Sequence, residues 1–410
     1  MRKIIALSIC LFFSLFGFSQ NSLSDYLQSA IKNSPVFIDN QNQVNSLAYD
    51  SMLIRAALKP QVNFTSNNMY APVINGYGYD AIITNGGNYN ALLAANYTLI
   101  GKNNLNNKFS ALTIQKQNLE LSTKLNERDL RQTVTSQYIT VYGEQQILAT
   151  TQKVLEVMKE ENIILKSITE NGVFKQTDYL SFLVNFKQQQ ISFAQQKLQT
   201  QTDLFVLNYL CGISDTTYNT LQEPFVKLSQ NKSTEQTTPF QQFVLDSLKI
   251  QNSFEQLKFN YQPKINLLGD AGYNTTFIYQ SQKNFGASVG LNLNIPIYDG
   301  KQRKLQTSKL KLSENTRIGY ADFYKRQYTI KQMQLLQQIS ETENIISEAR
   351  EQTTLSETLL KANIKLLQTG DTRITDYLLS LTNFISSQST LQQLRTSKMQ
   401  LINQYNYLNY

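Results

Sequence analysis

An internal duplication with a period of about 200 residues constrains the fold of this chain more than any other feature. Pro60, which opens an alternating apolar run, has a counterpart in Pro263. A Gly-x5-Asp-Tyr-Leu motif at 172–180 recurs at 370–378. The landmarks keep their order and nearly their spacing, so we predict two copies of one structural unit.

Each copy is predicted to contain a helix, two strands, a long helix, a reversal and a second long helix. We expect polar helices to end just before the two prolines, because a residue that precedes proline disfavours helical geometry. The predicted division is a signal peptide at 1–19, a first repeat at 20–211, a linker at 212–238 and a second repeat at 239–410.

The first residues predict export from the cytoplasm. Arg2 and Lys3 precede an apolar run at 4–18, and Gly17-Phe18-Ser19 supplies the small residues that a signal peptidase requires. No later stretch holds the ~20 uninterrupted apolar residues of a membrane-spanning helix.

Composition excludes several function classes. The chain has no histidine, and Cys211 is the only cysteine after the predicted leader, so imidazole metal sites, His-activated nucleophiles and internal disulfides are excluded. No pattern places two carboxylates in one pocket, and we predict no enzyme, cofactor or metal site. Without Arg2 and Lys3 the 38 basic residues fall to 36 against 30 acidic ones, a net charge of +6 that is scattered along the chain. Nucleic acid is therefore not an expected partner.

The strand runs carry the most specific pattern. Residues 285–297 alternate apolar and polar side chains without a break, 89–99 and 265–279 do so less cleanly, and 62–70 is the weakest run. Strands of this kind, with an apolar outer face, a polar inner face and tyrosines near their ends, fit a membrane β-barrel wall. On this pattern alone, a half-buried sheet in a soluble domain is an equal alternative.

The strand count favours an oligomer if the strands enter lipid. Four strands cannot close a barrel, and an open edge in lipid leaves unpaired backbone groups that cost several kcal/mol each. Two chains would give eight strands and a filled barrel, whereas three would give twelve and a lumen. Polar, glycine-rich inner faces favour the trimer.

The long helical runs at 102–170 and 301–368 contain no proline, and the first would be about 100 Å long if continuous. Apolar residues follow 4-3-7 spacing at Leu105, Phe109, Leu112 and Leu119, and again from Val134, which predicts coiled-coil packing. Polar residues such as Gln145 interrupt this thin seam, as expected for a wall with water on two sides. A compact four-helix bundle is the alternative.

The two reversals hold the candidate site residues. Gly172 and Gly370 stand where a left-handed residue should end each long helix. Asp178 and Asp376 fall early in the next helices, where a carboxylate interacts favourably with the helix dipole. This structural role competes with a role in gating.

The whole chain after the leader resembles the TolC-like outer-membrane efflux protein family. The resemblance rests on the duplication, the two Gly-x5-Asp-Tyr-Leu reversals, and the segment 295–300 (Ile-Pro-Ile-Tyr-Asp-Gly) that leads from a strand into a Lys/Arg-rich helix. In the first half the matching exit, 97–101, shares only its glycine.

The resemblance implies a homotrimer with a twelve-stranded barrel in the outer membrane and a helical tunnel, or α-barrel, through the periplasm. It also implies a passive exit duct of a tripartite efflux or type I secretion system. Its partners would be a periplasmic adaptor (membrane fusion) protein, an inner-membrane pump of RND or ABC type, and outer-membrane lipid.

The resemblance further implies a gate at the reversals, and the sequence departs from its usual pattern. Asp178 matches the family's gating aspartate, but Leu367 and Thr372 stand at the positions of its tyrosine and arginine partners, with Arg373 one residue away. A further aspartate of some relatives falls at Leu379.

We therefore predict passive export of small molecules. Export of proteins or peptides through the same duct is the alternative within the family. A soluble periplasmic coiled-coil scaffold or adaptor is the alternative from another class, and a hydrolase is the least supported for want of a site.

Overall fold

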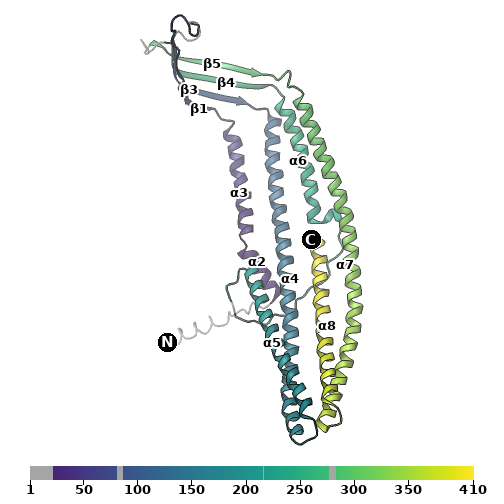
Figure 1. Ribbon diagram of the computed structural model, residues 1–410. Helices are drawn as coiled ribbons and strands as arrows, with labels where there is room; N and C mark the ends of the chain where they lie inside the picture. The colour runs from purple at the N-terminus through teal and green to yellow at the C-terminus, as the bar shows by residue number, and fades with distance from the viewer. Residues whose placement is uncertain (1–21, 81–85, 216, 277–282) are drawn as a thin grey trace, which may run out of the picture. The chain divides into compact units, whose positions relative to one another are not determined.

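The structure of the protein is a computed structural model that describes residues 22–80, 86–215, 217–276 and 283–410 (Figure 1). The predicted signal peptide at 1–19, and the end of the third predicted strand run with Phe277 and Tyr279, lie outside these residues. Along the chain the elements are α2 (Leu23–Asn33), α3 (Pro35–Ala56), β1 (Gln61–Thr65), β2 (Asn68–Tyr70), β3 (Gly87–Leu99), α4 (Lys102–Glu170), α5 (Gln176–Leu210), a short 3-10 helix (Thr234–Gln236), α6 (Thr238–Asn260), β4 (Lys264–Thr275), β5 (Phe285–Asn294), α7 (Gln302–Thr369) and α8 (Ile374–Leu408).

The chain forms two compact units. Unit 1 comprises Met1–Ile38, Lys124–Pro239 and Tyr324–Tyr410, and unit 2 comprises Asp39–Thr123 and Phe240–Phe323. Each unit contains segments from both halves of the sequence, so the units are not the predicted repeats, whose boundaries stay a prediction. None of the helices in the described residues is both long and apolar enough to cross a membrane.

Unit 2 contains one antiparallel sheet in the order β1-β3-β4-β5, with β2 also paired to β3 (Figure 1). The weakest predicted run, 62–70, therefore contains two short strands, β1 and β2, which lie one after the other along β3. The break is held by Asn90 of β3, whose backbone oxygen accepts from Ser66 Oγ at 2.9 Å and whose side-chain oxygen accepts from Asn67 N at 2.8 Å.

The strand register confirms the predicted two-faced sheet. Directly opposed residues of an antiparallel pair point to the same face. Leu93 of β3 lies opposite Phe64 and Ala271, and Ala271 lies opposite Ala287. On one face the register aligns Val62, Phe64, Ala91, Leu93, Ala95, Tyr97, Leu99, Ile265, Leu267, Ala271, Tyr273, Phe285, Ala287, Val289, Leu291 and Leu293.

The opposite face of the sheet is mainly polar: it carries asparagine, serine, glycine and aspartate, together with Leu92, Ala94 and Leu268. Ser288 of β5 donates to Asp270 of β4 at 2.7 Å, and the two residues are directly opposed in the register. The apolar face is open in the single chain, where Val289 is 91% exposed. A large exposed apolar face of this kind marks an interaction surface with lipid or with another protein.

Unit 1 is a helical assembly with its core between α2, α4 and α5. Val134, Tyr138 and Val141, three of the predicted seam residues, are fully buried there with Leu204 and Leu207 of α5. The Tyr138 hydroxyl donates to Gln222 O of the linker at 2.7 Å.

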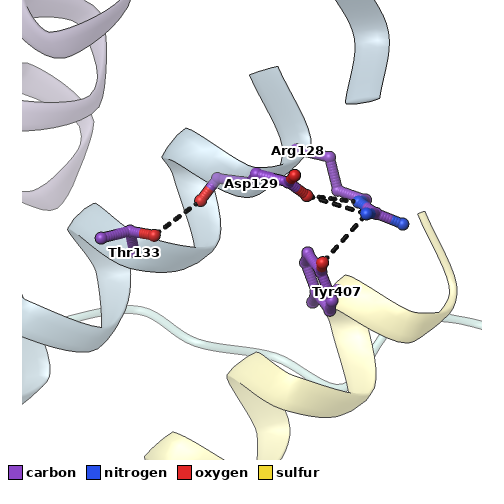
Figure 2. Close-up of polar contacts among 4 residues, drawn as sticks. All are labelled: Arg128, Asp129, Thr133 and Tyr407. Carbon is purple, nitrogen blue, oxygen red and sulfur yellow. Dashed lines mark hydrogen bonds and ion pairs between the residues drawn. The ribbon is translucent and has the colours of Figure 1, made fainter. Parts of the chain in front are cut away.

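Polar side chains fix further segments of unit 1. Gln145, predicted as an interruption of the seam, is buried and binds the linker instead: its amide donates to Asn219 O and accepts from Leu221 N, both at 2.9 Å. In Figure 2 the Arg128 guanidinium lies over the Tyr407 ring of α8, 4.1 Å from its centroid, while donating to the Tyr407 hydroxyl and to Asp129. These contacts join α4 to the linker and to α8.

Candidate functional site

Both reversals, which lie in unit 1, have the same backbone geometry. Gly172 follows the end of α4 with a φ of +78°, and Gly370 follows the end of α7 with a φ of +79°. Val173 N donates to Ile168 O at 3.2 Å, and Asp371 N donates to Leu366 O at 2.8 Å. These bonds satisfy carbonyl groups that the helix ends leave free, and they require a left-handed residue that glycine adopts without strain. The predicted role of both glycines as helix terminators is confirmed.

Asp178 and Asp376 lie in the first turns of α5 and α8, as predicted. In neither helix does the side chain of the preceding residue cap the first turn. The first backbone N–H groups carry the positive end of the helix dipole, and each carboxylate lies in that turn. Asp376 also accepts from Arg373 Nε at 3.1 Å.

The structure does not join the two reversals through the implied gate residues. Arg373 is 80% exposed and pairs with Asp376 in its own turn. Among the described residues no hydrogen bond or ion pair links Asp178 to Thr372 or Arg373. Leu379, at the position of the family's further aspartate, is exposed.

An apolar cluster, the tip cluster, packs α4, α5, α7 and α8 together next to the reversals. Its buried members are Val154, Met158, Leu165, Phe182, Leu360, Leu367, Ile374, Tyr377 and Leu381. The Phe182 ring lies 6.1 Å from that of Phe186 and 6.4 Å from that of Tyr377. Leu367, the position at which the resemblance implies a polar gate partner, is fully buried in this cluster and makes apolar contacts.

Two buried polar groups near this cluster were not predicted. Glu161 of α4 is 4% exposed; one carboxylate oxygen accepts from Gln368 Nε2 of α7 at 3.4 Å, and the other has no partner. The buried Tyr377 hydroxyl of α8 also has no partner. Burial raises the pKa of Glu161, and it raises the pKa of Tyr377, with the Glu161 charge adding to that rise. The sequence did carry a signal, because Glu161 continues the 4-3-4 spacing of Val154, Met158 and Leu165.

A second acidic group of unit 1 lies between α4 and α5. Burial, with a hydrogen bond to Asp203 and repulsion from it, raises the pKa of Glu144 from 4.5 to about 7. Asp203 already accepts hydrogen bonds from Gln137 and Gln199. One proton shared by the two carboxyl groups is therefore favoured near neutral pH.

We expect Glu144→Gln to stabilise the protein at alkaline pH. A glutamate whose pKa rises on folding contributes its full stability below its ordinary pKa and loses it as the pH rises through the raised value. The free energy of unfolding of the variant should match that of the parent near pH 4.5 and exceed it at pH 8 by about 1–2 kcal/mol, after allowance for solvent screening at this partly buried site. Denaturant unfolding across this pH range measures the difference; the exposed Glu156→Gln is the control, and a constant offset at every pH would contradict the expectation.

An exposed apolar stripe runs along α5. It consists of Leu180, Val184, Ile191, Leu198 and Phe205, spaced by four and seven residues as in a coiled-coil seam. Its members are all at least 46% exposed in the single chain. This face of α5 is therefore suited to packing against another helix.

No protein-family model matches the sequence, and no curated protein matches it. Solved structures do match in three dimensions. The outer membrane protein VceC from Vibrio cholerae shares 13% identity over 94% of this chain and 96% of its own, with a TM-score of 0.73. The Campylobacter jejuni CmeC outer membrane channel shares 12% identity over 94% of this chain and 85% of its own, with a TM-score of 0.74. The open state of the Neisseria gonorrhoeae MtrE outer membrane channel shares 14% identity over 95% of this chain and 89% of its own, with a TM-score of 0.72.

This chain has the fold of the TolC-like outer-membrane channels. The matched part covers 94–95% of this chain. The fold class predicted from the sequence, mainly α with four strand positions per chain, is thereby confirmed.

Proposed function

We propose that the protein is the outer-membrane exit duct of an export system and works as a homotrimer. The sheet carries this proposal. Within the described residues its outer edges, β1 with β2 on one side and β5 on the other, pair with no further strand. Open edges and an exposed apolar face would be costly in lipid for a single chain, whereas three sheets joined edge to edge form a closed cylinder of twelve strand positions.

The helices support the same assembly. The exposed stripe of α5 needs a partner helix to cover it, and a second copy of the chain offers helices of matching length. We propose that the long helices of three copies form a water-filled tunnel through the periplasm. The polar face of the sheet would line the lumen in the outer membrane.

In this proposal the duct is passive and its cargo is small molecules. The chain supplies a path, and the energy comes from an inner-membrane pump of RND or ABC type coupled through a periplasmic adaptor. These partners would dock at the reversals around Gly172 and Gly370 and hold them apart. The similar proteins CmeC and MtrE are outer membrane channels, which supports the location proposed for this one.

The proposal is tested by fractionation and sizing of the full-length protein. Recovery in the outer-membrane pellet, a detergent-corrected mass near three protomers and stepwise conductance in planar bilayers are expected. A monomer that buffer alone extracts from the periplasm would overturn the proposal and favour a soluble scaffold.

We expect Asp178→Ala to loosen the closed tip of the trimer. Among the described residues of its own chain the Asp178 carboxylate has no side-chain partner, and we propose that Arg373 of a neighbouring protomer, 80% exposed and paired within its own turn only with Asp376, supplies one. Loss of one exposed charged contact per protomer should cost about 1 kcal/mol, a shift of about fivefold in the closed-to-open ratio. Single-channel recording measures this shift, and Asp371→Ala on the other reversal is the control. Unchanged conductance would leave Asp178 with its helix-start role alone.

A further inference from the structure

The buried carboxylate of Glu161 is costly to keep in place. Its residue is 4% exposed, its one hydrogen bond, from Gln368 Nε2, is long at 3.4 Å, and its second oxygen has no partner. An ionised carboxylate in such a site lacks the donors that would compensate for lost hydration. The protonated form is therefore favoured while the site stays closed.

Glu161 also joins the two helical hairpins of one chain, of which α4 and α5 form the first and α7 and α8 form the second. It belongs to α4 of the first hairpin, Gln368 belongs to α7 of the second, and Tyr377 belongs to α8 of the second. Met158 and Leu165, one turn to either side of Glu161 on α4, are fully buried in the tip cluster. Separating the hairpins would break the bond to Gln368 and bring water to the carboxyl group.

Few charged groups act on this site. On α4 the neighbouring Glu160 repels the Glu161 charge, which adds to the rise of its pKa. From α7 the facing polar group is Gln368, and from α8 it is the Tyr377 hydroxyl. From α5 and the turn before it, the members of the tip cluster and the residues packed against it are Phe182, Phe174, Tyr179, Leu183 and Phe186, none of them a lysine, arginine, aspartate or glutamate. Among the described residues no lysine or arginine forms an ion pair with Glu161.

We propose that Glu161 is a proton-dependent latch that holds the two hairpins of each protomer together next to the reversals. The proposal rests on the proposed function as a gated duct and adds the residue that sets its pH response. Closure of the tip favours the protonated form of Glu161, because burial raises the pKa of its carboxyl group. In the open tip the carboxyl group is hydrated, its pKa returns toward the ordinary value, and the ionised form is favoured. Acid therefore stabilises the closed tip, and a rise of pH through the shifted pKa favours opening.

The size of the response follows from linkage. Between the ordinary and the raised pKa, the open-to-closed ratio should rise by about tenfold per pH unit for each glutamate that releases its proton. Glu161→Gln keeps the size of the side chain and the oxygen that accepts from Gln368, but it cannot ionise. The variant should hold the closed tip at all pH values.

The experiment compares the parent, Glu161→Gln and Glu160→Gln as purified full-length proteins between pH 5 and pH 8. The exposed Glu160 is a control on the same helix: its replacement should lower the midpoint of the pH profile slightly, because its charge adds to the rise of the Glu161 pKa, but should keep the pH dependence. Two readouts are taken: open probability in planar bilayers, and amide hydrogen exchange, corrected for intrinsic rates, in the segments 154–168 and 374–384. The parent and Glu160→Gln should open and exchange faster as the pH rises, whereas Glu161→Gln should be flat in both readouts.

The two readouts distinguish a failure of the proposed latch from a failure of the proposed duct. A parent-like pH profile in Glu161→Gln, or a flat profile in Glu160→Gln, would overturn the latch. If the parent forms no channel but Glu161→Gln still flattens the pH dependence of exchange, the latch stands as a property of the helices and the duct fails. Tyr377→Phe provides a second test: loss of its hydroxyl should move the midpoint of the profile without abolishing it.

Discussion

Replacing Gly272 by alanine is expected to abolish formation of the native sheet. Gly272 lies in β4 directly opposite Leu92 of β3, with a φ of +152° that residues with a Cβ rarely adopt. An added Cβ would lie 2.1 Å from Ala91 O and 2.9 Å from Leu92 Cα, both backbone atoms that cannot rotate away. The backbone strain and the clash together should cost more than about 4 kcal/mol, because the two central strands must separate to admit one methyl group.

The matched control for this substitution is Gly290→Ala in β5. Nothing lies within 4 Å of a Cβ added there, and Gly290 is also in a paired strand, opposite Leu268. The measurements are the yield of heat-labile oligomer in detergent and the protection of β3 and β4 amides from hydrogen exchange. Near-normal yield and protection for Gly272→Ala would show that the sheet repacks around this position.

Replacing Phe182 by alanine is expected to produce the largest effect on the helices. The Phe182 ring is fully buried in the tip cluster between Phe186 and Tyr377. Its loss removes the aromatic contact between α5 and α8 and leaves a cavity, at a cost of about 3–5 kcal/mol. Because the cost falls on the closed arrangement of the two hairpins, the proposed channel should conduct more often at every pH.

Leu180→Ala, two residues earlier on the exposed side of α5, is the control within the chain. Hydrogen exchange of the single protomer in detergent should be faster near the reversals for Phe182→Ala and change little for Leu180→Ala. In the trimer Leu180→Ala should instead weaken assembly, if the stripe on α5 is covered by a second copy. Equal exchange rates in the two variants would contradict a special role for the tip cluster.

The elements that sequence pattern could predict are those fixed by local backbone chemistry. The two reversals follow from glycines that adopt positive φ, and the sheet follows from a period-2 alternation whose apolar residues the observed strand pairing aligns on one face. Proline also set helix ends, since α3 and α6 stop just before Pro60 and Pro263. Such features depend on a few residues each and require no knowledge of the tertiary contacts.

What the sequence could not predict depends on contacts between distant segments. Gln145 looked like a flaw in an apolar seam, and only the fold brings the linker backbone at Asn219 and Leu221 within reach of its amide. Glu161 shares the spacing of Val154, Met158 and Leu165, but this set lies outside the register of the seam that begins at Val134, and only the fold buries its side chain among α4, α7 and α8. Leu367 was interpreted as a lost polar partner, whereas the structure gives it a place in the tip cluster.

The buried thiol has a practical consequence for studying motion in this protein. Cys211, the one cysteine among the described residues, is fully enclosed beside Tyr26 and Leu207, and burial raises its pKa to about 12. A thiol in this state reacts slowly with alkylating reagents, because the thiolate is the reactive form. Spectroscopic probes can thus be attached to cysteines engineered at the two reversals with the native thiol left in place. Distances between labelled hairpins can then be followed while the pH or the adaptor is varied.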